Sequence, residues 1–217
     1  MKTVNRIITP ILSLLLLPAA FFLPIFRIYI ASGLTGAGAD ARPNLLDNFG
    51  LSEFISIFDI VKLAKSGAAD SMGVFKSLWD AIAGDKKQEI IDMLPGLHWG
   101  IIFLVFFVIV IILALALAIV TAATKKPLAS VCLSLAGIVS AFIMNACFNG
   151  FAKPFLNGAF NLNSILGNTN QLLGVLLGNV ATFEYMKLGL AYTAFLLIFI
   201  CTLILSVTAL MEQRNEG

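Results

Sequence analysis

Four long apolar stretches alternate with polar connections along the chain and dominate its hydropathy pattern. The stretches are Ile7–Phe26, Trp99–Ala123, Pro127–Phe148 and Leu188–Met211. Crossing a hydrocarbon core of about 30 Å takes about 20 helical residues at a rise of ~1.5 Å each, and each stretch supplies that length. The pattern therefore predicts an all-α integral membrane protein, built as a four-helix transmembrane bundle.

The connections divide the chain into five segments. These are a short N-terminus with the first helix (1–26), a long connection (27–98), a helical hairpin (99–148), a second connection (149–187) and the fourth helix with a short tail (188–217). Because only residues 124–126 join the second and third stretches, these two helices must run antiparallel.

Basic residues in the short flanking segments predict the orientation. Lys2 and Arg6 precede the first stretch, Lys125 and Lys126 fill the tight turn, and Arg214 follows the fourth stretch. All five fall on one side of a four-helix arrangement, and an excess of basic residues marks the cytoplasmic side. We therefore expect a multi-pass protein of the cell membrane, with both termini in the cytoplasm and both long connections exported.

The first stretch has an alternative interpretation as a cleaved signal peptide. Two basic residues precede the apolar run from Leu12 to Leu17, and Ala19 and Ala20 follow it. Apolar residues continue to Phe26, however, and small residues do not occupy both positions of a typical cleavage site. We therefore expect an uncleaved helix with kinks at its prolines.

The first connection carries three short amphipathic segments, which predict a helical cap on the exported side. Each segment places apolar residues at positions i, i+3, i+4 and i+7, the spacing of one helix face. The first begins near Ser52, where a serine can cap a helix. Because helices this short are marginal alone in water, their aromatic faces must bury against the bundle, the lipid or a partner. The side chains expected to contact the bundle or a partner are Phe54, Phe58, Phe75 and Trp79.

Residues at the ends of the apolar stretches predict contacts with lipid headgroups. Long cationic side chains can extend along an apolar surface until their charge reaches water. Tryptophan and histidine carry a polar group on an apolar ring and are suited to the membrane–water interface. The expected interfacial anchors are Arg27, His98, Trp99 and Lys187.

The second connection is unusual because residues 154–183 contain no charged residue. Asn and Gly alternate there with aliphatic residues, so the segment is too polar to span a membrane and too apolar to extend freely into water. It is compatible with a loop across the outer end of the bundle or with a re-entrant segment that lines a pore. We favour the loop, since non-helical backbone at membrane depth must be buried in protein.

Small and polar residues line one face of the third apolar stretch. They recur at spacings of four, three, four and four positions: Ser130, Ser134, Gly137, Ala141 and Asn145. Small residues let helix backbones approach closely, and hydroxyl and amide groups add hydrogen bonds between helices. We expect this face to pack within the bundle, with docking onto a partner's membrane helix as the alternative.

Composition and charge narrow the range of functions. The chain is 59% hydrophobic and 12% charged, with a formal net charge of +2, so neither a soluble domain nor a nucleic-acid partner is expected. The apolar stretches hold no ionisable side chain in their interiors, whereas pumps and ion-coupled transporters usually need one. The sequence has no nucleotide-binding glycine motif, and its one histidine supports neither a metal site nor a catalytic triad. We therefore expect no enzyme activity, cofactor, metal ion or nucleotide.

All three cysteines, Cys132, Cys147 and Cys201, lie within apolar stretches, so no disulfide is expected in the connections. The order of elements, with a long first connection, a tight turn and a shorter last connection, resembles that of claudin-like tetraspan proteins. The cysteine pair and the Trp and Gly-Leu-Trp motif of that family's first extracellular loop are missing from this sequence. The resemblance is therefore one of topology and implies no function.

These observations favour a non-catalytic structural or accessory subunit of a membrane protein complex, acting through helix packing and an apolar exported cap. The expected partners are the lipid bilayer and other membrane proteins or copies of the same chain. The alternative is a homo-oligomeric channel with residues 154–183 near the conducting path, because conduction needs polar groups rather than titratable ones.

Overall fold

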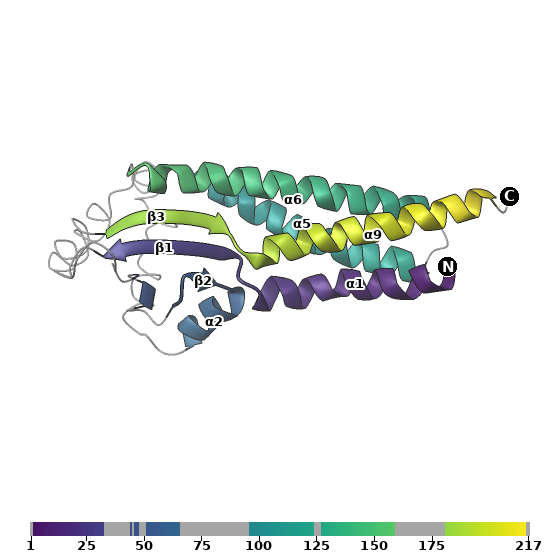
Figure 1. Ribbon diagram of the computed structural model, residues 1–217, viewed down its shortest axis with the longest axis horizontal. Helices are drawn as coiled ribbons and strands as arrows, with labels where there is room; N and C mark the ends of the chain where they lie inside the picture. Colours follow the sequence, from purple (N-terminus) through teal and green to yellow (C-terminus); the bar gives the residue numbers. More distant parts are fainter. Residues whose placement is uncertain are drawn as a thin grey trace, which may run out of the picture. The chain divides into compact units, whose positions relative to one another are not determined.

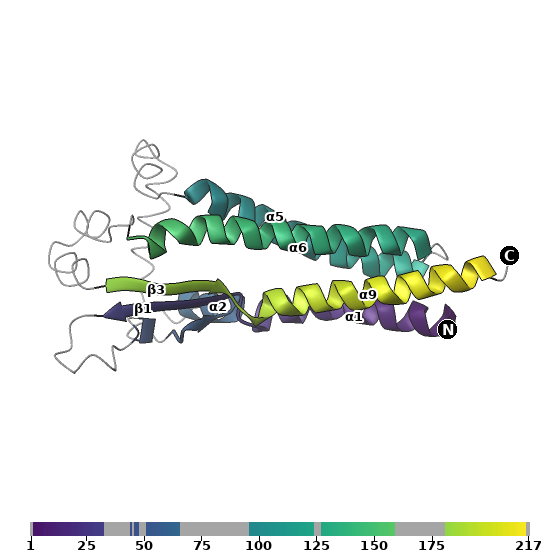
Figure 2. The ribbon, with the colours of Figure 1, turned by 45° about the horizontal axis from the view of Figure 1, so that its top comes forward.

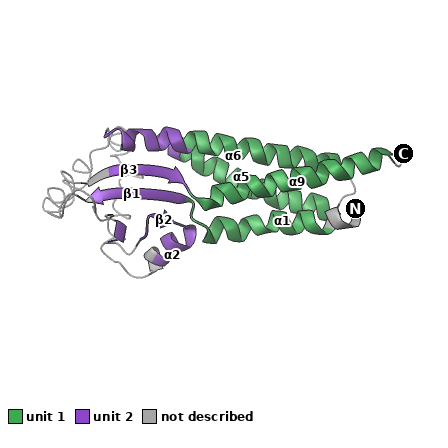
Figure 3. Ribbon diagram, in the orientation of Figure 1, with its two compact units in different colours: residues 1–25, 101–147, 189–217 green, residues 26–100, 148–188 purple. Residues whose placement is uncertain are grey.

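The computed structural model describes residues 2–32, 44, 46–47, 51–65, 96–123, 127–158 and 181–215. The chain divides into two compact units (Figure 3). We call residues 1–25, 101–147 and 189–217 the helical unit, and residues 26–100 and 148–188 the sheet unit. Several features expected from the sequence lie outside the described residues: Phe75, Trp79, the second and third amphipathic segments, Lys125, Lys126 and residues 159–180.

Four long helices make up most of the described chain (Figure 1). They are α1 (Lys2–Phe22), α5 (Leu97–Ala123), α6 (Pro127–Leu156) and α9 (Leu190–Asn215). Helices α5, α6 and α9 are long and apolar enough to cross a membrane, whereas the apolar part of α1, Ile7–Phe22, is shorter. The chain is mostly helical and compatible with a multi-pass membrane protein.

The first helix ends earlier than we expected from the sequence. The apolar stretch continues to Phe26, but α1 ends at Phe22 and Phe26 begins a strand. Pro24 has no backbone N–H and cannot continue the helical hydrogen-bond pattern. Its carbonyl instead accepts a hydrogen bond of 2.9 Å from the N–H of Ala191, in the first turn of α9. The end of α1 and the start of α9 are therefore joined through their backbones.

A three-stranded antiparallel sheet, which we did not predict from the sequence, lies in the sheet unit. Strand β1 (Phe26–Ser32) runs between β2 (Phe54–Ile55) and β3 (Ala181–Leu188). It pairs with β3 along its whole length, and Figure 1 shows these two strands side by side. Aromatic and β-branched residues in β1 favour an extended backbone. We predicted an all-α fold, with short helices in the first connection and a loop in the second, so the sheet is an addition to the predominantly helical architecture.

One short helix, α2 (Ile57–Lys65), is described in the first connection. It begins after Ser56 rather than at Ser52, the expected start. The Ser56 hydroxyl accepts a hydrogen bond of 3.1 Å from the backbone N–H of Asp59. The Asp59 carboxylate in turn accepts bonds from the N–H of Ser56 at 2.9 Å and from its hydroxyl at 2.6 Å. This reciprocal pair satisfies the free N–H groups at the helix start, as in a capping box.

The core of the helical unit is built from one face of each long helix, and Figure 2 shows α9 beside α1 and α5 beside α6. Along every face the buried residues recur at spacings of four, three and four positions, as expected for a helix stripe. They are Thr9, Ser13, Leu16 and Ala20 in α1; Val110, Ala114, Leu117 and Thr121 in α5; Ser130, Ser134, Gly137 and Ala141 in α6; and Phe195, Phe199, Thr202 and Ser206 in α9. Large aliphatic and aromatic side chains cover the outer faces.

Candidate functional site

Residues from three strands and the turn before β2 bring a cation, a carboxylate and two aromatic rings together in the sheet unit. Arg27, in β1, forms an ion pair with Glu53, and its Nη2 lies 3.1 Å from Oε1. The guanidinium carbon lies 5.0 Å from the ring centre of Phe54 and 5.1 Å from that of Tyr185. The Tyr185 hydroxyl donates a hydrogen bond to the Glu53 carboxylate. We call these four residues the Arg27 cluster.

Hydrogen bonding within the Arg27 cluster shifts two acidic groups in opposite directions. The bond from Tyr185 holds the pKa of Glu53 below its usual 4.5, and Arg27 adds to this effect. The same bond raises the pKa of Tyr185 above its usual 10.0. At neutral pH the carboxyl is therefore ionised and the phenol protonated, so the ion pair and the hydrogen bond coexist. These groups stabilise one another, which favours a role in joining β1, β2 and β3.

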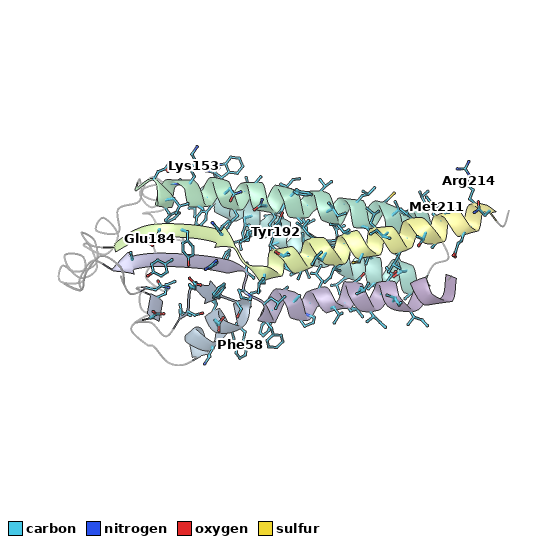
Figure 4. All side chains as sticks on the ribbon, in the orientation of Figure 1. Phe58, Lys153, Glu184, Tyr192, Met211 and Arg214 are labelled. Atoms are coloured by element: carbon cyan, nitrogen blue, oxygen red, sulfur yellow. The ribbon has the colours of Figure 1, made fainter. Side chains whose placement is uncertain are left out.

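Large apolar side chains are exposed on β2 and on α2, which follows it. Phe54 is 40% exposed, Phe58 45% and Ile60 44%, and Figure 4 labels Phe58 on α2. We call these three residues the β2–α2 patch. Phe58 and Ile60 lie two positions apart on α2 and therefore point to different sides of the helix. Exposed apolar side chains of this size typically mark contact sites for a protein or a membrane. Phe54 belongs to both the patch and the Arg27 cluster, so the cluster holds one edge of the patch in place.

The small-residue face of α6 is turned into the helical unit. Four of its members are buried and the last is half-buried: Ser130, Ser134, Gly137, Ala141 and Asn145. The hydroxyls of Ser134 and Thr202 lie 3.1 Å apart and form a hydrogen bond between α6 and α9. A Cβ added at Gly137 would overlap the ring of Phe199. The buried members therefore lie against the protein's own helices rather than on its outer surface.

All four expected interfacial anchors lie in the sheet unit and are exposed. Lys187 pairs with Arg27 across the β1–β3 ladder. His98 and Trp99 lie in the first turn of α5, with ring centres 5.1 Å apart. The Trp99 ring passes close to Gly150 of α6, where an added Cβ would come within 3.0 Å of it. Trp99 therefore also packs within the sheet unit.

Two residues of the Arg27 cluster, Glu53 and Tyr185, were not among the functional residues that we expected from the sequence. Both lie in connections for which we predicted no strand. The available signal was the presence of Thr182, Phe183 and Tyr185 in one short run, since β-branched and aromatic residues favour strands. We overlooked it because the run is short and joins the apolar start of α9 almost directly.

Within the part of the chain that the structure describes, no three His, Cys, Asp or Glu side chains gather closely enough to hold a metal ion. Comparison of the chain with protein-family models, with curated proteins and with solved structures finds no match. The function must therefore be inferred from the contacts, exposure and charge of the residues themselves.

Proposed function

We propose that the chain is a non-catalytic structural or accessory subunit of a membrane protein complex. The observation that carries this proposal is the β2–α2 patch, whose three large apolar side chains are 40–45% exposed outside the long apolar helices. Fully burying one side chain of this size is worth about 1.5–3 kcal/mol. Because each of these side chains is already more than half buried, covering its exposed part would contribute about 1 kcal/mol to association with a partner protein.

The Arg27 cluster supports this function by ordering the patch before a partner binds. Strand β2 is two residues long, so its own ladder holds it only weakly. The ion pair of Arg27 with Glu53 and the stacking of the guanidinium on Phe54 add two further links to β1. A surface that is already ordered loses less conformational entropy on binding.

We further propose that all four long helices cross the cell membrane, with both termini cytoplasmic and the sheet unit exported. Single cysteines at Thr3, Lys62 and Arg214, in a variant without the native cysteines, test this arrangement. On intact cells, an impermeant thiol reagent should label the cysteine at position 62 and reach the other two only after lysis. Labelling at position 3 on intact cells would show that α1 does not cross.

Photo-cross-linking and co-purification test the role of the patch. A photoreactive phenylalanine analogue at position 58 should cross-link to one defined membrane protein. Phe58→Asp or Ile60→Asp should lower recovery of that protein severalfold, because a charge then opposes burial of the apolar surface. Phe58→Leu, which keeps an apolar side chain at the same position, is the matched control and should keep recovery near the parent level. Equal recovery with Phe58→Asp and with the control would contradict the proposal.

The same preparation tests the alternative of a homo-oligomeric channel with residues 154–183 near its path. A mixed complex, or a single copy with its partner, supports the accessory subunit. A closed ring of identical chains, measured by mass, would instead support the channel.

A further inference from the structure

Buried hydroxyl groups gather at one end of the helical unit. They come from all four long helices: Thr9, Ser13, Thr121, Ser130, Ser134, Thr202 and Ser206. Toward the other end of the helical unit most buried residues are apolar, among them Leu16 in α1 and Phe199 in α9, and Ser140 of α6 is a buried hydroxyl there. The core therefore changes from mostly apolar to polar along the bundle axis.

The register of α6 against α9 pairs these hydroxyls across the two helices. Ser134 bonds to Thr202, and Gly137 lies against Phe199. The two helices are antiparallel, so four residues toward the start of α6 and four residues toward the end of α9 lead in the same direction along the bundle. Both steps cover about 6 Å, at ~1.5 Å per residue. Ser130 and Ser206 therefore lie at one level, one turn nearer to the chain termini than the Ser134–Thr202 pair.

The other two helices contribute to the same level. The N–H of Ala191 bonds to the carbonyl of Pro24. Thr9 lies fifteen positions before Pro24 and Ser206 lies fifteen after Ala191, so the antiparallel helices α1 and α9 bring them to a similar level. In α5, Thr121 lies two residues before the helix ends at Ala123.

In α6, Ser130 lies three residues after the helix begins at Pro127. The short connection between these two helix ends therefore places Thr121 at the level of Ser130. We call Thr9, Thr121, Ser130 and Ser206 the hydroxyl layer. It takes one buried residue from each helix.

Ser206 is a member of the layer for which the described residues supply no hydrogen-bond partner. The Thr121 hydroxyl donates a hydrogen bond of 2.7 Å to the carbonyl of Leu117. The Thr202 hydroxyl, one helical turn before Ser206 in α9, forms a hydrogen bond with the hydroxyl of Ser134. The Ser206 hydroxyl is 0% exposed and has no hydrogen-bond partner among the residues that the structure describes. An unpaired buried hydroxyl is unfavourable, since it has lost its contact with water without gaining a protein partner.

We propose that the hydroxyl layer binds water, held between Ser206 and Ser130. A buried water molecule needs two to four polar partners and enough room, and the facing hydroxyls offer both donors and acceptors. Serine and threonine side chains at this level are smaller than Leu16 and Phe199, which fill levels further along the bundle. The inference concerns the core of the helical unit and is independent of the proposed partner at the β2–α2 patch.

Water-edited solid-state NMR of the full chain in lipid bilayers tests the proposal. This experiment measures how fast magnetisation passes from water to each labelled carbon. We expect transfer to Ser206 and Ser130 to be severalfold faster than transfer to Phe199, which is fully buried in an apolar level. Thr208 is a second reference, because it lies on the outer face of α9 and bonds to the carbonyl of Leu205 at 2.8 Å. Transfer to Ser206 as slow as that to Phe199 would show a dry layer and overturn the proposal.

A pair of variants tests whether Ser206 itself holds the water. Ser206→Ala removes one of the two hydroxyls and should slow the transfer to Ser130 to the level of Phe199. Thr208→Ala, the matched control on the outer face, should leave the transfer to Ser130 unchanged. Rapid transfer to Ser130 that persists in Ser206→Ala would refute the bridge between the two serines.

Discussion

Replacing Gly137 by alanine should destabilise the helical unit, although alanine is the better helix former. A Cβ at this position of α6 would overlap the ring of Phe199. The ring is fully buried and cannot turn outward. The added methyl group must therefore displace the ring or separate α6 from α9, and either movement strains the nearby Ser134–Thr202 hydrogen bond.

The expected size of this effect follows from two opposing contributions. Overpacking a well-filled core costs about 1–3 kcal/mol, and the overlap with several ring carbons places this site near the upper end. Alanine favours the helix over glycine by about 1 kcal/mol. The net loss in free energy of unfolding is then about 2 kcal/mol. Since each kcal/mol shifts the melting temperature of a chain this long by about 2–4 °C, we expect a fall of about 4–8 °C.

A thiol-reactive dye in detergent can follow this unfolding. Cys147 is buried, whereas Cys132 and Cys201 are exposed. Replacing the two exposed cysteines by alanine leaves Cys147 as a thiol that reacts only when the helices separate. The melting temperature of Gly137→Ala is then read in this background against the parent.

A second substitution distinguishes a clash with Phe199 from a general weakening of α6. Phe199→Leu makes room for the methyl group, so its combination with Gly137→Ala should be more stable than the sum of the two single losses predicts. The reasoning is refuted if Gly137→Ala melts at or above the parent temperature. Strictly additive losses would likewise show that the two residues are not in contact.

Three further predictions concern hydrogen bonds in the two units. Ser134→Ala and Thr202→Val should each lower the free energy of unfolding by about 0.5–1 kcal/mol in the same dye assay. In a double-mutant cycle the two substitutions should show a coupling energy of about 0.6 kcal/mol. A coupling energy of zero would exclude the hydrogen bond between the two side chains. Ser56→Ala should cost about 1 kcal/mol by removing the cap of α2, seen as faster amide exchange in residues 57–65; unchanged exchange would contradict this. Glu53, followed by carbon NMR, should titrate below pH 4.5, and Tyr185→Phe should raise the midpoint. Because the folded-state pKa of Glu53 is lowered, the stability that its ionised form contributes is present above pH 4.5 and is lost as the pH falls through the midpoint. A titration midpoint that Tyr185→Phe leaves unchanged would contradict the hydrogen bond from Tyr185 to Glu53.

The apolar helices could be predicted from the sequence because hydropathy is a local property. Each residue contributes its own transfer free energy, so a run of about 20 apolar residues is recognisable without knowledge of its neighbours in space. Helices α5 and α9 accordingly begin and end within about one turn of the expected positions. Helix α6 begins at the expected residue but continues past the expected end at Phe148 to Leu156, into the segment that we predicted as a loop. The spacing from Ser130 to Ala141 likewise indicated one face of α6, since helix geometry alone places those residues together.

The strands and the Arg27 cluster were decided by tertiary structure. A strand is stabilised by hydrogen bonds to another strand, and β1 finds its partner in β3, at the far end of the chain. Nothing local to Arg27 marks Glu53 or Tyr185 as its neighbours. The sequence also did not determine which helix packs on the small-residue face of α6. The structure shows that it is α9, because Phe199 lies against Gly137 and Thr202 bonds to Ser134. Local sequence thus specifies which segments leave water, while the pairing of distant segments depends on contacts that exist only in the folded chain.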